Sequence, residues 1–164
     1  MSGTRTLVTG RGLVESPRWH GDRLYFSDWS AGEVVAVDLD GDSEVVARVA
    51  SLPLCTAWSP EGRLLIVSSP DGRLLRLEPD GSLVTHAELG QAGWNDIVVD
   101  GSLSGRRVWA EFGEGTPDGI CADGENAVWY ADVPNRCCVR VAEGGKALQS
   151  VALDRGGFAC AGWP

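Results

Sequence analysis

Long apolar runs are missing from this sequence. No stretch approaches the roughly 20 residues that a helix needs to span a bilayer, and the first ten residues lack the apolar core of a signal peptide. Positive charge is scarce as well, because 14 Lys and Arg residues stand against 23 Asp and Glu residues, for a formal net charge of −9. Such a surface repels phosphate backbones and anionic lipid heads. We therefore expect a cytoplasmic protein that binds neither nucleic acid nor membranes.

The signatures of several common catalytic sites are also missing. His20 and His86 fall in no HxH or HExxH spacing, so we expect both at the surface rather than on a metal. A Gly-x-Ser-x-Gly elbow is absent, because Leu103 takes the place of the nucleophile in residues 101–105, and no phosphate-binding Gly-x-x-x-x-Gly-Lys loop occurs. The cysteines are odd in number and lack CxxC spacing, so free and mostly buried thiols are expected at Cys55, Cys121, Cys137, Cys138 and Cys160.

Turn signals dominate what is present. The chain of 164 residues has 22 glycines, and Asp-Gly, Glu-Gly and Pro-Asp-Gly turns separate short apolar segments that alternate or are β-branched. No segment keeps a 3.6-residue apolar period. The sequence therefore predicts an all-β fold in a single domain over residues 1–164.

The chain also repeats itself. Residues 20–49, 60–89 and 123–153 each read as strand, turn, strand, turn, strand, and Leu24 and Leu64 match with a step of 40. A repeat of about 40 residues with four short antiparallel strands is the length of one β-propeller blade. A β-sandwich would also explain short strands, but it would not predict the copied order of turns.

The repeat loses its spacing in the middle, since 63 positions separate Leu65 from its match Val128. Trp94–Asp100 reads as an inner strand and residues 101–112 as an outer one, so a piece between them is expected to be missing. We predict blades at approximately 13–50, 51–90 and 113–153, with a hybrid blade at 91–112 and a stub at 154–164. The seven tryptophans should mostly pack between sheets, and Trp94 is the candidate for contact with a ligand.

Three segments in the same order resemble a known family. They are Gly12-Leu-Val-Glu-Ser-Pro-Arg-Trp19, Asn95-Asp-Ile-Val-Val-Asp100, and Gly115-Thr-Pro-Asp-Gly-Ile-Cys-Ala-Asp123 with the following Val128-Trp-Tyr-Ala-Asp132. The chain resembles the senescence-marker-protein, gluconolactonase and luciferin-regenerating-enzyme family, whose members are six-bladed propellers. The resemblance implies an incomplete propeller with about four blades' worth of sequence. It also implies an internal deletion near Asp100-Gly101 and a missing C-terminal part.

The resemblance further implies a site on the propeller axis. Glu15 and Asp118 would hold one divalent metal ion (Ca, Zn, Mg or Mn), Asp118 would also be the catalytic base, and Asn95 would bind substrate beside the metal. Carboxylate and amide oxygens suit such hard cations. The family's further Asn ligand from a middle blade has no counterpart here. Gly93 stands where the family often has an Arg, which leaves the substrate preference open.

Without the resemblance these residues have ordinary interpretations. Glu15 reads as a solvated strand-end carboxylate, Asp118 as an Asp-Gly turn residue and Asn95 as a turn or strand start. Their joint occurrence favours metal-dependent hydrolysis of a sugar-type lactone. Two alternatives stay open: a non-catalytic calcium-binding or interaction fragment, and an unselected remnant that folds only in part. An open arc of blades would expose sheet faces, so a homodimer or an aggregation-prone species is expected.

Overall fold

Residues 5–99, 108–111 and 113–160 are described by the computed structural model of the protein. These residues form strands, turns and loops and include no helix, so none of them could cross a membrane as a helix. The strands are β1 Val14–His20, β2 Arg23–Asp28, β3 Glu33–Val37, β4 Ser43–Arg48, β5 Leu54–Trp58, β6 Leu64–Ser68, β7 Arg73–Leu77, β8 Leu83–Glu88, β9 Pro117–Ala122, β10 Val128–Asp132, β11 Cys137–Val141 and β12 Ala147–Ala152.

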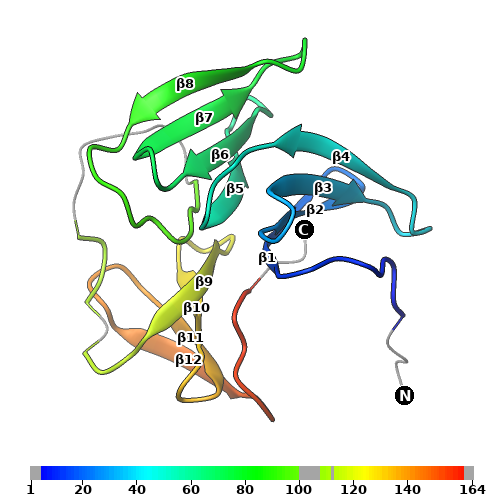
Figure 1. Ribbon diagram of the computed structural model, residues 1–164. Helices are drawn as coiled ribbons and strands as arrows, with labels where there is room; N and C mark the ends of the chain where they lie inside the picture. The colour runs from blue at the N-terminus through cyan, green and yellow to red at the C-terminus, as the bar shows by residue number, and fades with distance from the viewer. Residues whose placement is uncertain (1–4, 100–107, 112, 161–164) are drawn as a thin grey trace.

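The strands form three separate four-stranded antiparallel sheets. The first sheet contains β1 to β4, the second β5 to β8 and the third β9 to β12, and each joins its strands in sequence order. In Figure 1 the first strand of each sheet, β1, β5 or β9, lies toward the middle of the molecule. Simple meanders without crossovers exclude the Greek-key sandwich. The predicted all-β, incomplete propeller-type fold is confirmed, and Leu24, Leu64 and Val128 lie on the second strand of their sheets as expected.

Local turn chemistry explains the short strands. Between β3 and β4, Oδ1 of Asp38 accepts hydrogen bonds from the backbone N–H groups of Asp40, Gly41 and Asp42, each at 2.9 Å. Gly41 has a φ of 96°, and a Cβ at this position would lie 2.8 Å from the carbonyl oxygen of Leu7. Only glycine meets both demands without strain. An Asp-Gly pair thus favours a tight turn between two consecutive strands.

The main core lies between the first and second sheets, where β1 and β2 pack against β5. Its buried side chains share this interface and are Val34, Ala47, Leu54, Leu64 and Ile66. The opposite face of the first sheet packs against Leu7 and Val8 of the N-terminal segment. The buried members of the apolar clusters in the described residues all lie on the first two sheets.

The predicted inner strand at Trp94–Asp100 is wrong for the residues that the structure describes, because 94–99 contain no strand. The segment instead lies over the second sheet, and Trp94, Ile97 and Val99 pack against a buried cluster that includes Leu65 and Leu74. Burial of its apolar side chains, rather than strand pairing, holds it in place. The proposed deletion point at Asp100-Gly101 and most of the predicted outer strand lie outside the described ranges.

The third sheet leaves apolar side chains in water. Leu148 and Val151 on β12 are 44% and 41% exposed, and Phe158 in the segment that follows is 56% exposed. Exposed apolar surface beside an unpaired edge strand favours association. We therefore still predict a homodimer, which light scattering would report as a mass of about twice the 17.4 kDa of one chain.

A matched pair of variants tests this prediction. Leu148→Lys combined with Val151→Lys on β12 should shift the protein to the monomer. Val84→Lys on β8 adds a charge to the edge strand of the second sheet and should leave the dimer intact. A monodisperse monomer of the unmodified chain would contradict the prediction.

Candidate functional site

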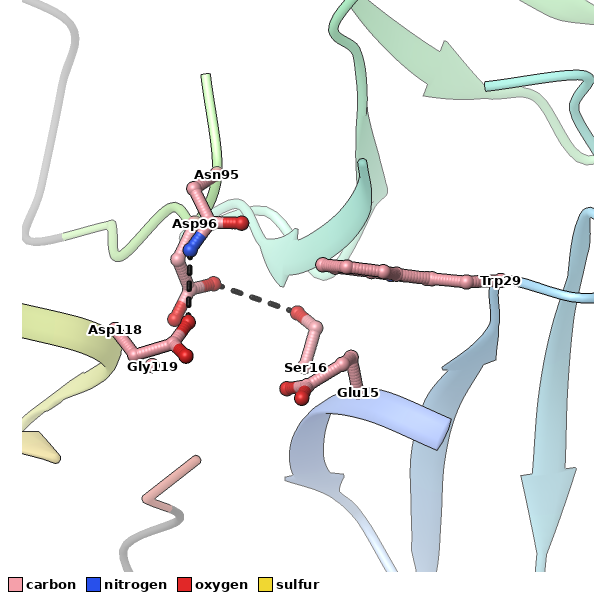
Figure 2. A pocket seen from close by; sticks show the side chains of 7 residues that line it. All are labelled: Glu15, Ser16, Trp29, Asn95, Asp96, Asp118 and Gly119. Atoms are coloured by element: carbon pink, nitrogen blue, oxygen red, sulfur yellow. Dashed lines mark hydrogen bonds between the residues drawn. The ribbon is translucent and has the colours of Figure 1, made fainter. Parts of the chain in front are cut away.

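One small pocket brings the three predicted site residues together. Glu15 comes from β1, Asn95 from the segment after the second sheet and Asp118 from β9, and all three line the same hollow. Figure 2 shows their side chains with the other residues that line it, which are Ser16, Trp29, Asp96 and Gly119. The hollow encloses about 180 Å³ including its open mouth. The roles assigned to these residues from the sequence stay predictions.

A bulge in the first sheet directs Glu15. The pairing of β1 with β2 shifts register between Glu15 and Arg18, and Ser16 adopts a φ of 53°, which is uncommon for a residue with a side chain. Ser16 is buried, and its Oγ accepts a hydrogen bond of 2.9 Å from the backbone N–H of Thr56 on β5. The second sheet therefore supports the unusual backbone. Such supported outliers concentrate at functional sites.

Asn95 and Asp118 contact each other directly across the pocket. Nδ2 of Asn95 donates a hydrogen bond of 2.8 Å to Oδ1 of Asp118 (Figure 2). Beside Asp118, a Cβ on Gly119 would lie 2.5 Å from Cα of Ala159, so the C-terminal segment approaches β9 closely. The backbone N–H of Gly119 donates to the carbonyl oxygen of Phe158 at 2.8 Å. These contacts hold the start of β9 and the Asp118 side chain in place.

Asp96 is a pocket residue to which the sequence analysis assigned no role. Its Oδ1 accepts hydrogen bonds of 2.8 Å from Nη2 of Arg18 and from the backbone N–H of Ile97. Its Oδ2 accepts one of 2.7 Å from the backbone N–H of Ile120, and Ser16 Oγ lies 3.4 Å from Oδ1. The sequence signal for Asp96 is the Asn95-Asp96 pair, in which an acidic residue directly follows the predicted substrate-binding residue.

The pocket is rich in negative charge. Burial raises the pKa of the Glu15 carboxyl above its ordinary value, and the nearby carboxylate of Asp118 raises it further. Among the described residues, Asp96 is ion-paired with Arg18, whereas Glu15 and Asp118 form no ion pair. Carboxylates in such a setting favour a cation. In the described parts of the chain, no group of three or more His, Cys, Asp and Glu side chains is set to hold a metal, so a cation here would have only the carboxylates of Glu15 and Asp118 as charged ligands.

Other candidate groups lie away from the pocket. His86 is exposed as expected, but His20 is partly buried, because its ring stacks on Trp58 with centroids 3.5 Å apart. The cysteines are free, and burial raises the pKa of the Cys55 thiol, which keeps it unreactive. Trp94 covers the second sheet, so the tryptophan that lines the pocket is Trp29.

Comparisons with known proteins agree with this architecture. The family described as the SMP-30/gluconolactonase/LRE-like region matches residues 75–161, which is more than half of the chain. No curated protein matches the sequence.

Solved structures give fold similarity at low identity. A gluconolactonase from Xanthomonas campestris is 15% identical with a TM-score of 0.63, and the match covers 94% of this chain and 81% of that one. A luciferin-regenerating enzyme is 16% identical with a TM-score of 0.60, covering 93% and 80%. A virginiamycin B lyase from Staphylococcus aureus is 15% identical with a TM-score of 0.54; 85% of this chain is covered, and the chain spans 56% of the lyase's length. At such identities the likeness concerns the fold alone.

Proposed function

Because the chain belongs to the SMP-30/gluconolactonase/LRE-like family, we propose that it hydrolyses a sugar-type lactone in the cytoplasm with the help of one divalent metal ion. Glu15 and Asp118 would hold the ion, and Asn95 would bind the substrate. The observation that supports this proposal is the meeting of Glu15, Asn95 and Asp118, which are distant in sequence, around one pocket.

The donor atoms of the pocket fit a hard cation. Glu15 and Asp118 offer carboxylate oxygens. The Asn95 amide donates its nitrogen to Asp118, which leaves its oxygen for the substrate. Oxygen donors are typical of Ca²⁺, Mg²⁺ and Mn²⁺ sites and are tolerated by Zn²⁺. A cation would also relieve the repulsion between the carboxylates of Glu15 and Asp118.

The chain's own residues account for the proton transfers of lactone hydrolysis. Asp118 accepts the Asn95 hydrogen bond on Oδ1, so Oδ2 is the atom that would take a proton from the attacking water. The water oxygen bonds to the lactone carbonyl carbon, the ring C–O bond breaks, and the proton passes from Asp118 to the departing ring oxygen to give a hydroxy acid. When bound, the metal ion supplies Lewis-acid stabilisation of the carbonyl oxygen. Asn95 keeps the Asp118 carboxylate oriented during these steps.

A second function is supported by how closely the residues of the pocket pack. The hollow has no room even for a water-sized molecule, whereas ligand sites normally enclose roughly 300 to 1,000 Å³. A sugar ring does not fit into the hollow in this structure. A non-catalytic calcium-binding or interaction domain is therefore the alternative.

Hydrolysis of glucono-1,5-lactone, followed with a pH indicator and corrected for the spontaneous reaction, distinguishes the two functions. We expect enzyme-dependent hydrolysis that stops with EDTA and returns with excess Ca²⁺, Mn²⁺ or Zn²⁺. Calcium binding by calorimetry without hydrolysis of any sugar lactone would favour the alternative. Neither binding nor hydrolysis would refute both.

A further inference from the structure

The third sheet has few apolar links to the rest of the molecule. Strands β1 and β2 pack directly on β5, but within the described residues no strand of the third sheet packs comparably on the other two sheets. The pocket nevertheless needs Asp118 of β9 beside Glu15 of β1 and Asn95. Polar contacts must therefore set the position of β9 relative to the other two segments.

One carboxylate, that of Asp96, contacts both β9 and β1. Asp96 bonds to the backbone N–H of Ile120, two residues after Asp118. It also bonds to Arg18 and lies 3.4 Å from the hydroxyl of Ser16, the residue next to Glu15. Asp96 itself follows Asn95 in the chain. Each of the three candidate site residues is thus within three positions of a group that binds Asp96.

Arg18 extends this network. Its Nη2 donates to Oδ1 of Asp96 at 2.8 Å and to the carbonyl oxygen of Ile97 at 2.9 Å, and its Nη1 lies 3.5 Å from the carbonyl oxygen of Cys160. The side chains of Arg18 and Asp96 are only 12% and 7% exposed. Charge-assisted hydrogen bonds away from water are directional and strong. The pair therefore connects β1, the segment after the second sheet and the C-terminal segment.

Asp96 is poorly suited to be a metal ligand in its own right. Both of its oxygens already accept short hydrogen bonds, and the guanidinium of Arg18 neutralises its charge. Glu15 and Asp118, in contrast, have no such cation beside them among the described residues. Asp96 is therefore suited to hold neighbouring segments, whereas Glu15 and Asp118 are the carboxylates suited to a cation.

We propose that Asp96 is a positioning residue, whose carboxylate, paired with Arg18, holds the segments carrying Glu15, Asn95 and Asp118 together around the pocket. The positioning follows from the contacts described above, and only its consequence for a bound cation rests on the proposed function. Partners that hold metal ligands in place typically change metal affinity by about 10- to 100-fold when removed.

Nuclear magnetic resonance of Asp96→Asn tests the positioning without any metal. We expect the side-chain amide resonances of Asn95 to move toward those of a free amide, because the hydrogen bond to Asp118 is lost. We also expect faster hydrogen exchange of the Ile120 N–H. A role in general stability alone would lower the melting temperature without moving the Asn95 resonances of the folded protein. Arg18→Lys keeps the charge but cannot reach Asp96, Ile97 and Cys160 at once as the guanidinium does. It should therefore cause the same changes in weaker form, and it provides the test if Asp96→Asn does not fold.

Terbium binding tests the consequence for the cation. Tb³⁺ is a luminescent substitute for Ca²⁺, and Trp29 in the pocket wall can sensitise its emission. We expect Asp96→Asn to weaken Tb³⁺ binding by about 10-fold or more. The control is Asp123→Asn, which removes the same charge and breaks an Asp–Arg pair with Arg140 beyond the other end of β9. It should leave the affinity and the Asn95 resonances unchanged.

The outcomes separate this proposal from the proposed function. If folded Asp96→Asn keeps the Asn95 resonances and the Ile120 exchange rate of the unmodified protein, the positioning role is wrong. If the unmodified protein binds no Tb³⁺, the metal site fails, and the resonance measurements still decide the role of Asp96.

Discussion

We expect Asp118→Asn to lower the rate of the proposed metal-dependent lactone hydrolysis by about 100-fold or more, because a positioned general base typically contributes 10²- to 10⁴-fold. The substitution keeps the shape of the side chain and an oxygen for the Asn95 hydrogen bond, but it removes the negative charge and the proton acceptor. Initial rates with excess metal measure the effect on turnover separately from weaker metal binding.

The control for this prediction lies on the same hairpin. Asp123 follows β9, and its Oδ1 accepts hydrogen bonds from the backbone N–H groups of Glu125 and Ala127 in the turn before β10. Asp123→Asn therefore removes an equal charge from the third sheet without touching the pocket, and its hydrolysis rate should stay near that of the unmodified protein. Full activity of Asp118→Asn would remove this residue from the catalytic role.

Ile66→Ala destabilises the protein by about 2 to 5 kcal/mol, the range for large-to-small changes in a packed core. Ile66 is fully buried in the centre of the cluster between the first and second sheets, beside Val34 and Leu54. The lost methyl and methylene groups leave a cavity. The neighbouring strands cannot close it, because hydrogen bonds hold them in the first and second sheets. Urea unfolding followed by tryptophan fluorescence gives the change in the free energy of unfolding.

Two milder variants bracket this result. Ile66→Val removes one methylene group and should cost about 0.5 to 1.5 kcal/mol. Leu148→Ala on the exposed strand β12 should change the stability of the monomer by less than about 0.5 kcal/mol. An Ile66→Ala protein as stable as the unmodified one would mean that the first two sheets do not share a core.

Local signals were sufficient to predict the strands and their order. Asp-Gly turns and short alternating segments act within a few residues, so Leu24, Leu64 and Val128 could be assigned to equivalent strands before any tertiary contact was known. The same reasoning failed at residues 94–99. The pattern of their apolar side chains is typical of a strand. A strand, however, needs a neighbouring strand for its hydrogen bonds, whereas these residues pack their apolar side chains on a face of the second sheet.

For the candidate site, too, some residues could be predicted from the sequence and others could not. Motifs that resemble a known family indicated Glu15, Asn95 and Asp118, and the structure brings them to one pocket. The roles of Ser16 and Asp96 were not predictable from the sequence. A positive φ at Ser16 depends on a hydrogen bond from another sheet, and the bonds of Asp96 join residues up to 80 positions apart. The sequence by itself determined the strands that Asp-Gly turns delimit and the residue types that are present, because those depend on near neighbours. Only the tertiary structure decided that Asp96 is paired with an arginine, whereas Glu15 and Asp118 are not paired with one among the described residues, because that depends on contacts between sheets.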